Sequence, residues 1–383
     1  MIYLDNSATT PVFDGVGEVA RYYMTEQYFN PSGAYAPAAE VEKAVNRARK
    51  RVLDALGLHG TQNGSIVFTS GATESNNAAF SGALAAMRGT GRIIVGAAEH
   101  PSVYDTAAKY SALGYDIKTA PVTPTGCIDI EAFGELLSPD LQLVSIMLVN
   151  NEIGAINDIE KLYTLTKRAV PNAVFHVDGV QGFLKVPFNA RYCDMFSISG
   201  HKFHAPKGIG ALYVAKNVRF LGGQTGGGQE NGLRSGTLNT PGIMAMEKAI
   251  EINAANESSS VDTMRACKLR LAEHLLRIDD VLVNGPAPVA GAPHILNVSF
   301  LGVRGEVMLH ALEEKGIIVS TGSACSAHKS GPNRVLSAMG LNSKRQDSAV
   351  RFSFSPLNRP EEMDEVASAV RNIVTILRRY KRR

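Results

Sequence analysis

The sequence predicts an α/β fold in which a mostly parallel sheet is covered by helices, with a smaller α+β domain at the C-terminal end. Short apolar runs alternate with helical patterns between residues 66 and 214. Strands that are apolar along their whole length are typical of parallel sheets with both faces buried. The chain has 383 residues, 45% of them hydrophobic, which is enough for two domains with a large core.

The expected elements follow one another along the chain. Residues 37–57 are expected to form an amphipathic helix, because apolar side chains recur every three or four positions from Val41 to Leu56. In the larger domain we expect strands at 66–68, 93–95, 143–149, 174–177, 195–198 and 211–214, and helices from about residues 14, 73, 101, 159 and 241. Further on we expect helices at 264–277 and 305–315, strands at 296–300, 317–319 and 350–354, and a helix from about residue 360.

The polar stretch 256–260 predicts the boundary between the two domains. The larger domain would then comprise residues 13–257. The smaller domain would comprise residues 1–12 together with 258–383 and carry the loop with Cys325. The opening segment is small and polar and suits an ordered arm more than a helix.

Composition excludes several classes of protein. The net charge of +3, from 39 Lys and Arg against 36 Asp and Glu, is too small to imply nucleic-acid binding. No apolar run is long enough to cross a membrane, and the first residues lack a signal-peptide pattern, so we expect a cytoplasmic protein. Cys127, Cys193, Cys267 and Cys325 are widely separated, so we expect neither a metal site nor a disulfide framework.

Lys202 is the candidate anchor of an aldehyde cofactor. It ends the string Ser-Gly-His-Lys, directly after the strand expected at 195–198. A lysine amine forms a Schiff base only when neutral, and with a reference pKa of about 10.4 roughly one free lysine in 2,500 is neutral at pH 7. Neighbouring groups must therefore assist it, and a turn glycine, a hydroxyl and an imidazole that can bind phosphate precede it. We predict that Lys202 holds pyridoxal phosphate, although the string alone also fits a surface lysine.

Other polar motifs follow the remaining strands. Residues 69–77 place small residues, a glycine and the Thr73 hydroxyl at a helix start, which suits a phosphate but equally an ordinary helix cap. His100 could stack on a cofactor ring or move protons, although an isolated histidine is more often structural. Asn151 follows seven apolar residues and suits the lining of a site. Asp178 could pair with a pyridine nitrogen and Gln181 with the ring oxygen, while a capping role for Asp178 has comparable weight.

Two loops carry further information. Cys325 lies among small polar residues between Gly and Pro, so we expect an exposed thiol, of which about 3% is thiolate at pH 7. The nearby His328 and Lys329 could raise that fraction, which makes Cys325 the candidate nucleophile among the four cysteines. The Gly-rich stretch 222–237 lacks the G-K-[ST] ending of a nucleotide-binding loop, which argues against an NTPase.

Taken together, these motifs resemble those of cysteine desulfurases of the NifS/IscS type. These belong to the class V aminotransferases, a family of fold-type I pyridoxal-phosphate enzymes. The resemblance runs from about residue 3 to residue 353 and rests on residues 70–77, 149–154, 199–202, 233–237 and 323–325. It implies conversion of L-cysteine to L-alanine, with a persulfide on Cys325 whose sulfur passes to an acceptor protein for iron–sulfur cluster assembly or thiolation. It also implies a homodimer.

The resemblance implies a role for each matching residue. Lys202 would bind the cofactor and shuttle protons, His100 would stack on the ring and assist as acid or base, and Arg351 would bind the substrate carboxylate. Asn151 would touch ring or substrate, and Thr237 would reach the phosphate of the other subunit. The cofactor-binding residues implied in this way are Gly71, Ala72, Thr73, His100, Asn151, Asp178, Gln181, Ser199, His201, Lys202 and Thr237.

Three positions depart from the family pattern. Tyr35 and Arg334 stand where we expect a histidine, and Asn231 replaces a common arginine. These three departures bear on the entrance of the expected active site, on the dimer contacts or on the choice of sulfur acceptor. A selenocysteine lyase, a class V aminotransferase and a non-enzymatic sulfur-carrier platform stay open as alternatives.

Overall fold

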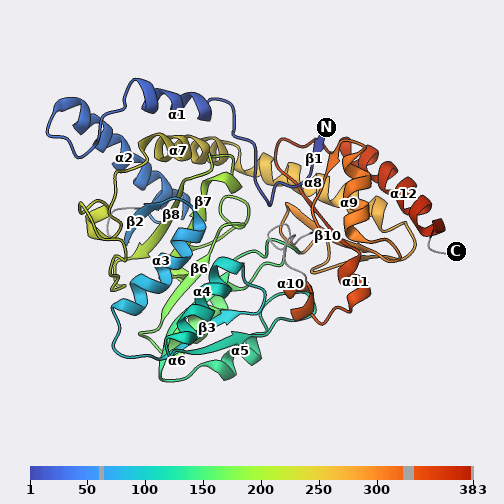
Figure 1. The fold of residues 1–383 in the computed structure, drawn as a ribbon, viewed down its shortest axis with the longest axis horizontal. Coiled ribbons are helices and arrows are strands. Elements are labelled where there is room, and N and C mark those ends of the chain that lie inside the picture. Colours follow the sequence, from blue (N-terminus) through green and yellow to red (C-terminus); the bar gives the residue numbers. More distant parts are fainter. Residues whose placement is uncertain (60–63, 322–331, 381–383) are drawn as a thin grey trace.

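A seven-stranded sheet forms the centre of the larger part of the protein (Figure 1). The structure is a computed structural model that describes residues 1–59, 64–321 and 332–380. Strand β8 runs antiparallel to both of its neighbours, and the other pairs are parallel, as the sequence predicts. In spatial order the strands are β2 (Gly64–Thr69), β8 (Gly210–Ala215), β7 (Met195–Ser199), β6 (Val174–Asp178), β5 (Leu141–Met147), β3 (Arg92–Gly96) and β4 (Asp116–Ala120).

Helices cover both faces of this sheet. Alternate residues of one strand point to opposite faces, so Ile93 and Val95 pack with α3 and α4, whereas Ile94 packs in the cluster that contains α2, α6 and α7. All three side chains are fully buried. The helices around the sheet are α1 (Val16–Thr25), α2 (Ala36–Ala55), α3 (Ala72–Ala85), α4 (Pro101–Ala112), α5 (Ile130–Leu136), α6 (Ile159–Ala169) and α7 (Thr240–Ala255).

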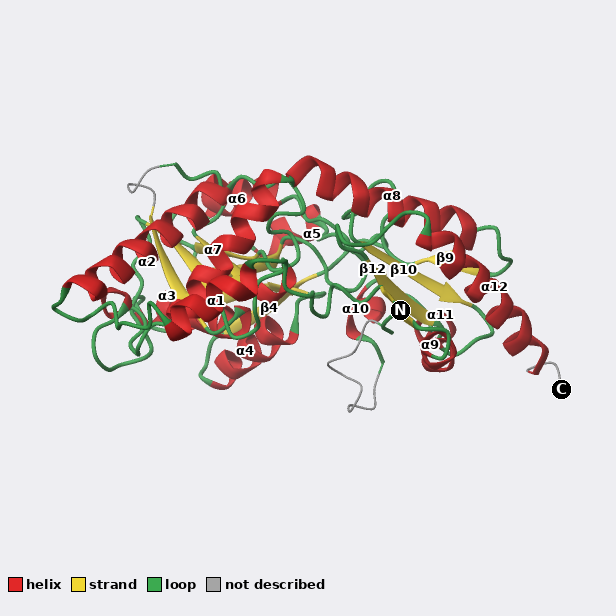
Figure 2. Cartoon of the chain, turned by 90° about the horizontal axis from the view of Figure 1, so that it is seen from above, coloured by secondary structure: helices red, strands yellow, loops and turns green. Residues whose placement is uncertain are grey.

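A second, smaller core lies around a three-stranded antiparallel sheet in the order β12-β10-β9. Figure 2 shows α8 and α12 beside these strands, with the start of the chain in this half of the molecule. The two-stranded parallel pair β1–β11 adds the start of the chain to it. The elements here are β1 (Ile2–Tyr3), α8 (Glu257–Leu275), β9 (Val281–Val283), β10 (Ile295–Phe300), α9 (Gly305–Glu313), β11 (Ile317–Ile318), α10 (Arg334–Ala338), α11 (Ser343–Asp347), β12 (Ala349–Ser353) and α12 (Glu362–Tyr380).

The structure differs from the expected elements in a few places. The polar stretch 256–260 is not an extended linker, because α8 already begins at Glu257 after the single residue Asn256. Strand β5 ends at Met147, two residues earlier than expected. The domain boundary at residues 257 and 258 stays a prediction. Across the described residues, no helix is both long and apolar enough to span a membrane.

Candidate active site

A cavity of about 500 Å³ opens at the carboxyl ends of the parallel strands. Ligands of open α/β sheets bind at this edge. The cavity wall brings together motifs that are far apart in the sequence. The predicted site residues that line it are Gly71, Ala72, Thr73, His100, Asn151, Asp178, Gln181, Ser199, His201, Lys202 and Arg351.

Lys202 reaches the N-terminal arm from the turn that follows β7. Its Nζ donates to the backbone carbonyls of Ser7, at 2.7 Å, and Ala8, at 2.8 Å. Asp178 ends β6, the parallel neighbour of β7, so the two residues approach the cavity from adjacent strands. The arm residues were not anticipated, because a backbone carbonyl leaves no signature in the sequence.

Asp178 is buried and held in place by two hydrogen bonds. Its Oδ2 accepts from Asn76 Nδ2 at 2.8 Å and its Oδ1 from the backbone N–H of Val180 at 3.1 Å. Asn76 also donates to the hydroxyl of Ser102 at 2.8 Å, and that hydroxyl lies 2.8 Å from His100 Nδ1. Asn76 and Ser102 thus connect Asp178, predicted to bind the cofactor, with His100, predicted to be catalytic. The sequence string contains Asn76, but only the fold reveals what it contacts.

His100 is the residue that caps α4. Its Nδ1 accepts from the backbone N–H of Ser102 at 3.1 Å, so the neutral ring carries its proton on Nε2. Burial lowers the pKa of His100; the charges of Lys202 and Arg334 add to this effect, and Asp178 opposes it. The structure therefore favours a neutral imidazole at the cavity wall.

The start of α3 provides the groups that a phosphate requires. Gly71 has φ of 152°, a conformation that favours glycine, and no described side chain caps the helix. A Cβ at Gly71 would lie 3.6 Å from Ser199 Oγ, so the helix start and the β7 turn meet. Burial, together with Lys202, Lys207 and others, lowers the pKa of His201 to about 4. Open helix N–H groups, a hydroxyl and two lysines fit the phosphate of pyridoxal phosphate.

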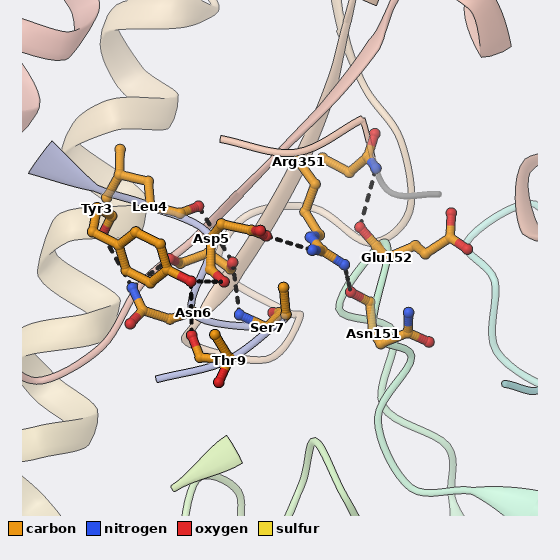
Figure 3. Close-up of polar contacts among 12 residues, drawn as sticks. Tyr3, Leu4, Asp5, Asn6, Ser7, Thr9, Asn151, Glu152 and Arg351 are labelled. Atoms are coloured by element: carbon orange, nitrogen blue, oxygen red, sulfur yellow. Dashed lines mark hydrogen bonds and ion pairs between the residues drawn. The ribbon is translucent and has the colours of Figure 1, made fainter. Parts of the chain in front are cut away.

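Arg351, which lines the cavity, connects its own strand with two segments that are distant in the sequence (Figure 3). One Nη donates to the carbonyl of Asn151 at 2.9 Å and the other to the carboxylate of Asp5 at 2.6 Å. Its side chain is 3% exposed, and its Nε has no partner within the described part of the chain. A buried donor without a partner is unfavourable, so the arginine is suited to bind an anion in the cavity. Asp5 was not singled out in the sequence.

Gln181 is held from two sides. Its amide nitrogen donates to the Ser7 carbonyl at 2.9 Å, and its Oε1 lies 3.3 Å from His294 Nε2. Burial holds the pKa of His294 well below its ordinary value, so the ring is neutral. Gln181 lines the cavity, and its contact with the ring oxygen of a cofactor stays a prediction.

Thr237 and Cys325 are the two remaining predicted site residues. Thr237 is exposed and does not line it. Cys325 belongs to residues 322–331, outside the described part of the chain. The Gly-rich stretch before Thr237 is tied to α3, since Arg234 Nε pairs with Glu74 at 2.8 Å.

The family departures occupy different places. Tyr35 precedes α2, is exposed and meets the edge of Phe29. Asn231 has φ of 55°, which asparagine tolerates better than most side chains. Arg334 begins α10 and faces the segment around His100.

The comparisons with known proteins show the family to which the chain belongs. A model of the aminotransferase class-V family matches residues 2–366, so the chain belongs to that family, which depends on pyridoxal phosphate. The chain is 38% identical over 380 residues to a cysteine desulfurase IscS of Methanosarcina thermophila, covering 98% of this chain and 93% of that one. It is 39% identical to a cysteine desulfurase of Bradyrhizobium diazoefficiens over 383 residues, covering 100% and 96%.

Solved structures show the same fold. A NifS-like protein superposes with a TM-score of 0.90 at 34% identity, covering 98% of this chain and 99% of that chain. A NifS-like protein from Rickettsia africae superposes with a TM-score of 0.88 at 30% identity, with the same coverage.

Proposed function

We propose that the chain is a pyridoxal-phosphate-dependent cysteine desulfurase that converts L-cysteine to L-alanine and holds the sulfur as a persulfide on Cys325. The observation that carries this proposal is the convergence of Lys202, Asp178 and the uncapped start of α3 on one cavity. Family membership supports the same activity. No specific observation favours a selenocysteine lyase, a transaminase or an inactive platform.

The cofactor would be held at both ends. Thr73, Ser199 and His201, with the N–H groups after Gly71, would bind the phosphate, and Asp178 would pair with the pyridine nitrogen. When bound, pyridoxal phosphate supplies an electron sink for the substrate carbon skeleton. A hydrogen bond to a charged group contributes about 1.5–3 kcal/mol, so several contacts at the phosphate are needed to hold it firmly.

Three residues would contact the cofactor aldehyde, the cofactor ring and the substrate carboxylate. Lys202 would bond to the cofactor aldehyde after leaving the carbonyls of Ser7 and Ala8, and it would later carry protons. His100, kept neutral by burial with its proton on Nε2, would lie on the ring face and assist as an acid through that proton. Arg351 would bind the substrate carboxylate through its remaining N–H groups, with Asn151 beside it.

Cys325 would take the sulfur. Its thiolate would attack the sulfur of the substrate; an S–S bond forms as the C–S bond breaks, and the carbon gains a proton to give alanine. An acceptor protein, an iron–sulfur scaffold or a thiolation enzyme, would then remove the sulfur. A cytoplasmic location belongs to the same proposal.

A homodimer belongs to it as well. Thr237 is exposed, away from the cavity of its own chain, and lies shortly after the Arg234–Glu74 contact that fixes its loop to α3. This placement leaves its hydroxyl available to the phosphate site of a second subunit.

Two substitutions test the proposed activity. Purified protein should show the absorbance of bound pyridoxal phosphate, and Lys202→Ala should lose the component due to the covalent link. Cys325→Ala should keep that absorbance and lose sulfur release from L-cysteine, measured together with alanine. Full sulfur release by Cys325→Ala would exclude the persulfide step, and protein that never binds the cofactor would exclude the enzyme altogether.

A further inference from the structure

Arg334 contacts one residue before His100 in the sequence and one residue after it. Its Nη2 donates to the carbonyl of Glu99, the residue directly before His100. Its guanidinium carbon lies 4.1 Å from the centre of the Tyr104 ring, on the first turn of α4. The planar guanidinium suits this pair of contacts, because it can stack on a ring while its edge donates hydrogen bonds.

The neighbouring Asn333 strengthens the attachment of α10. Its Oδ1 accepts from the backbone N–H of Leu336 at 2.8 Å, which caps α10, and its Nδ2 donates to Glu152 Oε2 at 2.6 Å. Glu152 follows β5, and Glu99 follows β3, the neighbour of β5 in the sheet. Two consecutive residues thus tie α10 to the strand ends that form the cavity wall.

The charge of Arg334 also acts on His100. The charged groups that face the imidazole are Asp178 on β6, Lys202 after β7, Asp105 on α4 and Arg334 on α10. Burial is the main reason that the pKa of His100 is low, and Arg334 adds to it. Arg334 is itself partly buried, and its Nη1 has no hydrogen-bond partner among the described residues. The carboxyl groups of Glu99, Glu152 and Asp105 also interact with the Arg334 charge.

We propose that Arg334 is a positioning residue for His100, which fixes the Glu99–His100 peptide and, through it, the orientation of the imidazole in the cavity. The proposal rests on the proposed function only where it concerns turnover. Arg334 does not line the cavity, so it acts through His100 and not on the substrate.

Two variants separate the effects of geometry and charge. Arg334→Gln removes the positive charge and most of the guanidinium N–H donors. Arg334→Lys keeps the charge but cannot stack on the Tyr104 ring and donate a hydrogen bond in the same way. We expect both variants to lower kcat with little change in KM, by about tenfold to a hundredfold, since a small displacement of a reacting group has an effect of this size. We expect the His100 titration, followed by NMR of labelled histidine and assigned with His100→Gln, to move to higher pH in Arg334→Gln only.

The matched control is Arg345→Gln. Arg345 lies on the nearby α11, where it donates to the Val283 carbonyl at 2.6 Å and to Asn284, far from His100 in its contacts. It should leave kcat, the circular dichroism of the bound cofactor and the His100 titration unchanged. If Arg334→Gln leaves all three unchanged as well, or if both variants lose activity only in step with melting temperature, the positioning role is excluded.

The NMR titration does not require desulfurase activity. A chain that releases no sulfur but shows the shifted His100 titration in Arg334→Gln would refute the proposed function and retain the contact between Arg334 and His100. Normal sulfur release by the parent protein, with an unshifted His100 titration and unchanged kcat in Arg334→Gln, would support the proposed function and refute the positioning role of Arg334.

Discussion

Asn76 connects Asp178 with the segment that carries His100. Its amide nitrogen donates to Asp178 Oδ2 and to the Ser102 hydroxyl, both at 2.8 Å, and its side chain is fully buried. Buried amides with satisfied donors hold their partners in one geometry. At the scale of single residues, the carboxylate that we assign to the pyridine nitrogen is therefore fixed before any ligand arrives.

The first prediction concerns the charge of Asp178. Asp178→Asn retains the size of the side chain and the contact with the Val180 N–H, but removes the negative charge that would pair with the protonated ring. The lost charged contact, about 1.5–3 kcal/mol, should weaken cofactor binding by roughly tenfold to a hundredfold. Equilibrium titration with pyridoxal phosphate measures this. Asp158→Asn, at the cap of α6, is the control and should bind normally; equal affinity in both variants would contradict the assignment.

At the scale of elements, the N-terminal arm connects the small sheet with the cavity. β1 pairs with β11. The Asp5 carboxylate meets Arg351 (Figure 3). The Thr10 N–H donates to the His201 carbonyl at 2.9 Å. Between these points lie the two carbonyls that receive Lys202. The position of the arm therefore determines where the lysine amine lies in the cofactor-free protein.

Asn6→Ala should loosen this arm. The buried Asn6 amide donates to the carbonyls of Tyr3, at 3.1 Å, and Ser353, at 2.9 Å. The substitution removes two hydrogen bonds worth about 0.5–1.5 kcal/mol each, although the Asn6 N–H still donates to Ser353 and Asn358 Nδ2 to Tyr3. It should therefore lower the free energy of unfolding by about 1–3 kcal/mol in chemical denaturation. The exposed Asn256→Ala should change it by less than about 0.5 kcal/mol. A comparable loss in both variants would show that Asn6 has no special role in the arm.

For the molecule as a whole, the sequence predicted the features that leave a pattern of residue types, namely the apolar strands and the polar motifs at their ends. The strands of the large sheet were recognisable because both of their faces are buried, and the polar motifs after them had to meet at one edge. β4 was missed, since its polar sequence DIKTA is only partly buried at the sheet edge. The five-residue helices α10 and α11 are too short for periodicity to reveal them.

The missing parts of the site are those that sequence patterns cannot specify. Lys202 meets backbone carbonyls of Ser7 and Ala8, and Arg334 meets the carbonyl of Glu99. Any residue type supplies such an acceptor, so only the three-dimensional path of the chain identifies it. The sequence did mark Arg334 in one way, because it departs from the family pattern at a position close to the segment with Cys325.

Buried histidines and buried carboxyls oppose each other in the response of the whole molecule to pH. Burial lowers the pKa of His176 to about 3, while the pKa of Glu99 is raised well above its ordinary value, also mainly by burial. Acidification then favours proton uptake by the unfolded chain at His176 and by the folded chain at Glu99. The net curve of stability against pH cannot isolate either group, whereas a variant compared with the parent protein can.

The last prediction uses His176, whose ring nitrogens lie 2.8 Å from Ser145 Oγ and 2.9 Å from Ser197 Oγ. Its unfolded pKa is near 6.5, so between about pH 6.5 and pH 3 only the unfolded chain binds the proton, which costs the folded protein up to about 1.4 kcal/mol per pH unit. His176→Gln lacks this contribution and should lose less stability on acidification from pH 7 to 5, measured by denaturation of both proteins. His310→Gln, at an exposed site, should keep the parent slope. A parent slope in His176→Gln would mean that this histidine does not stay neutral in the folded core.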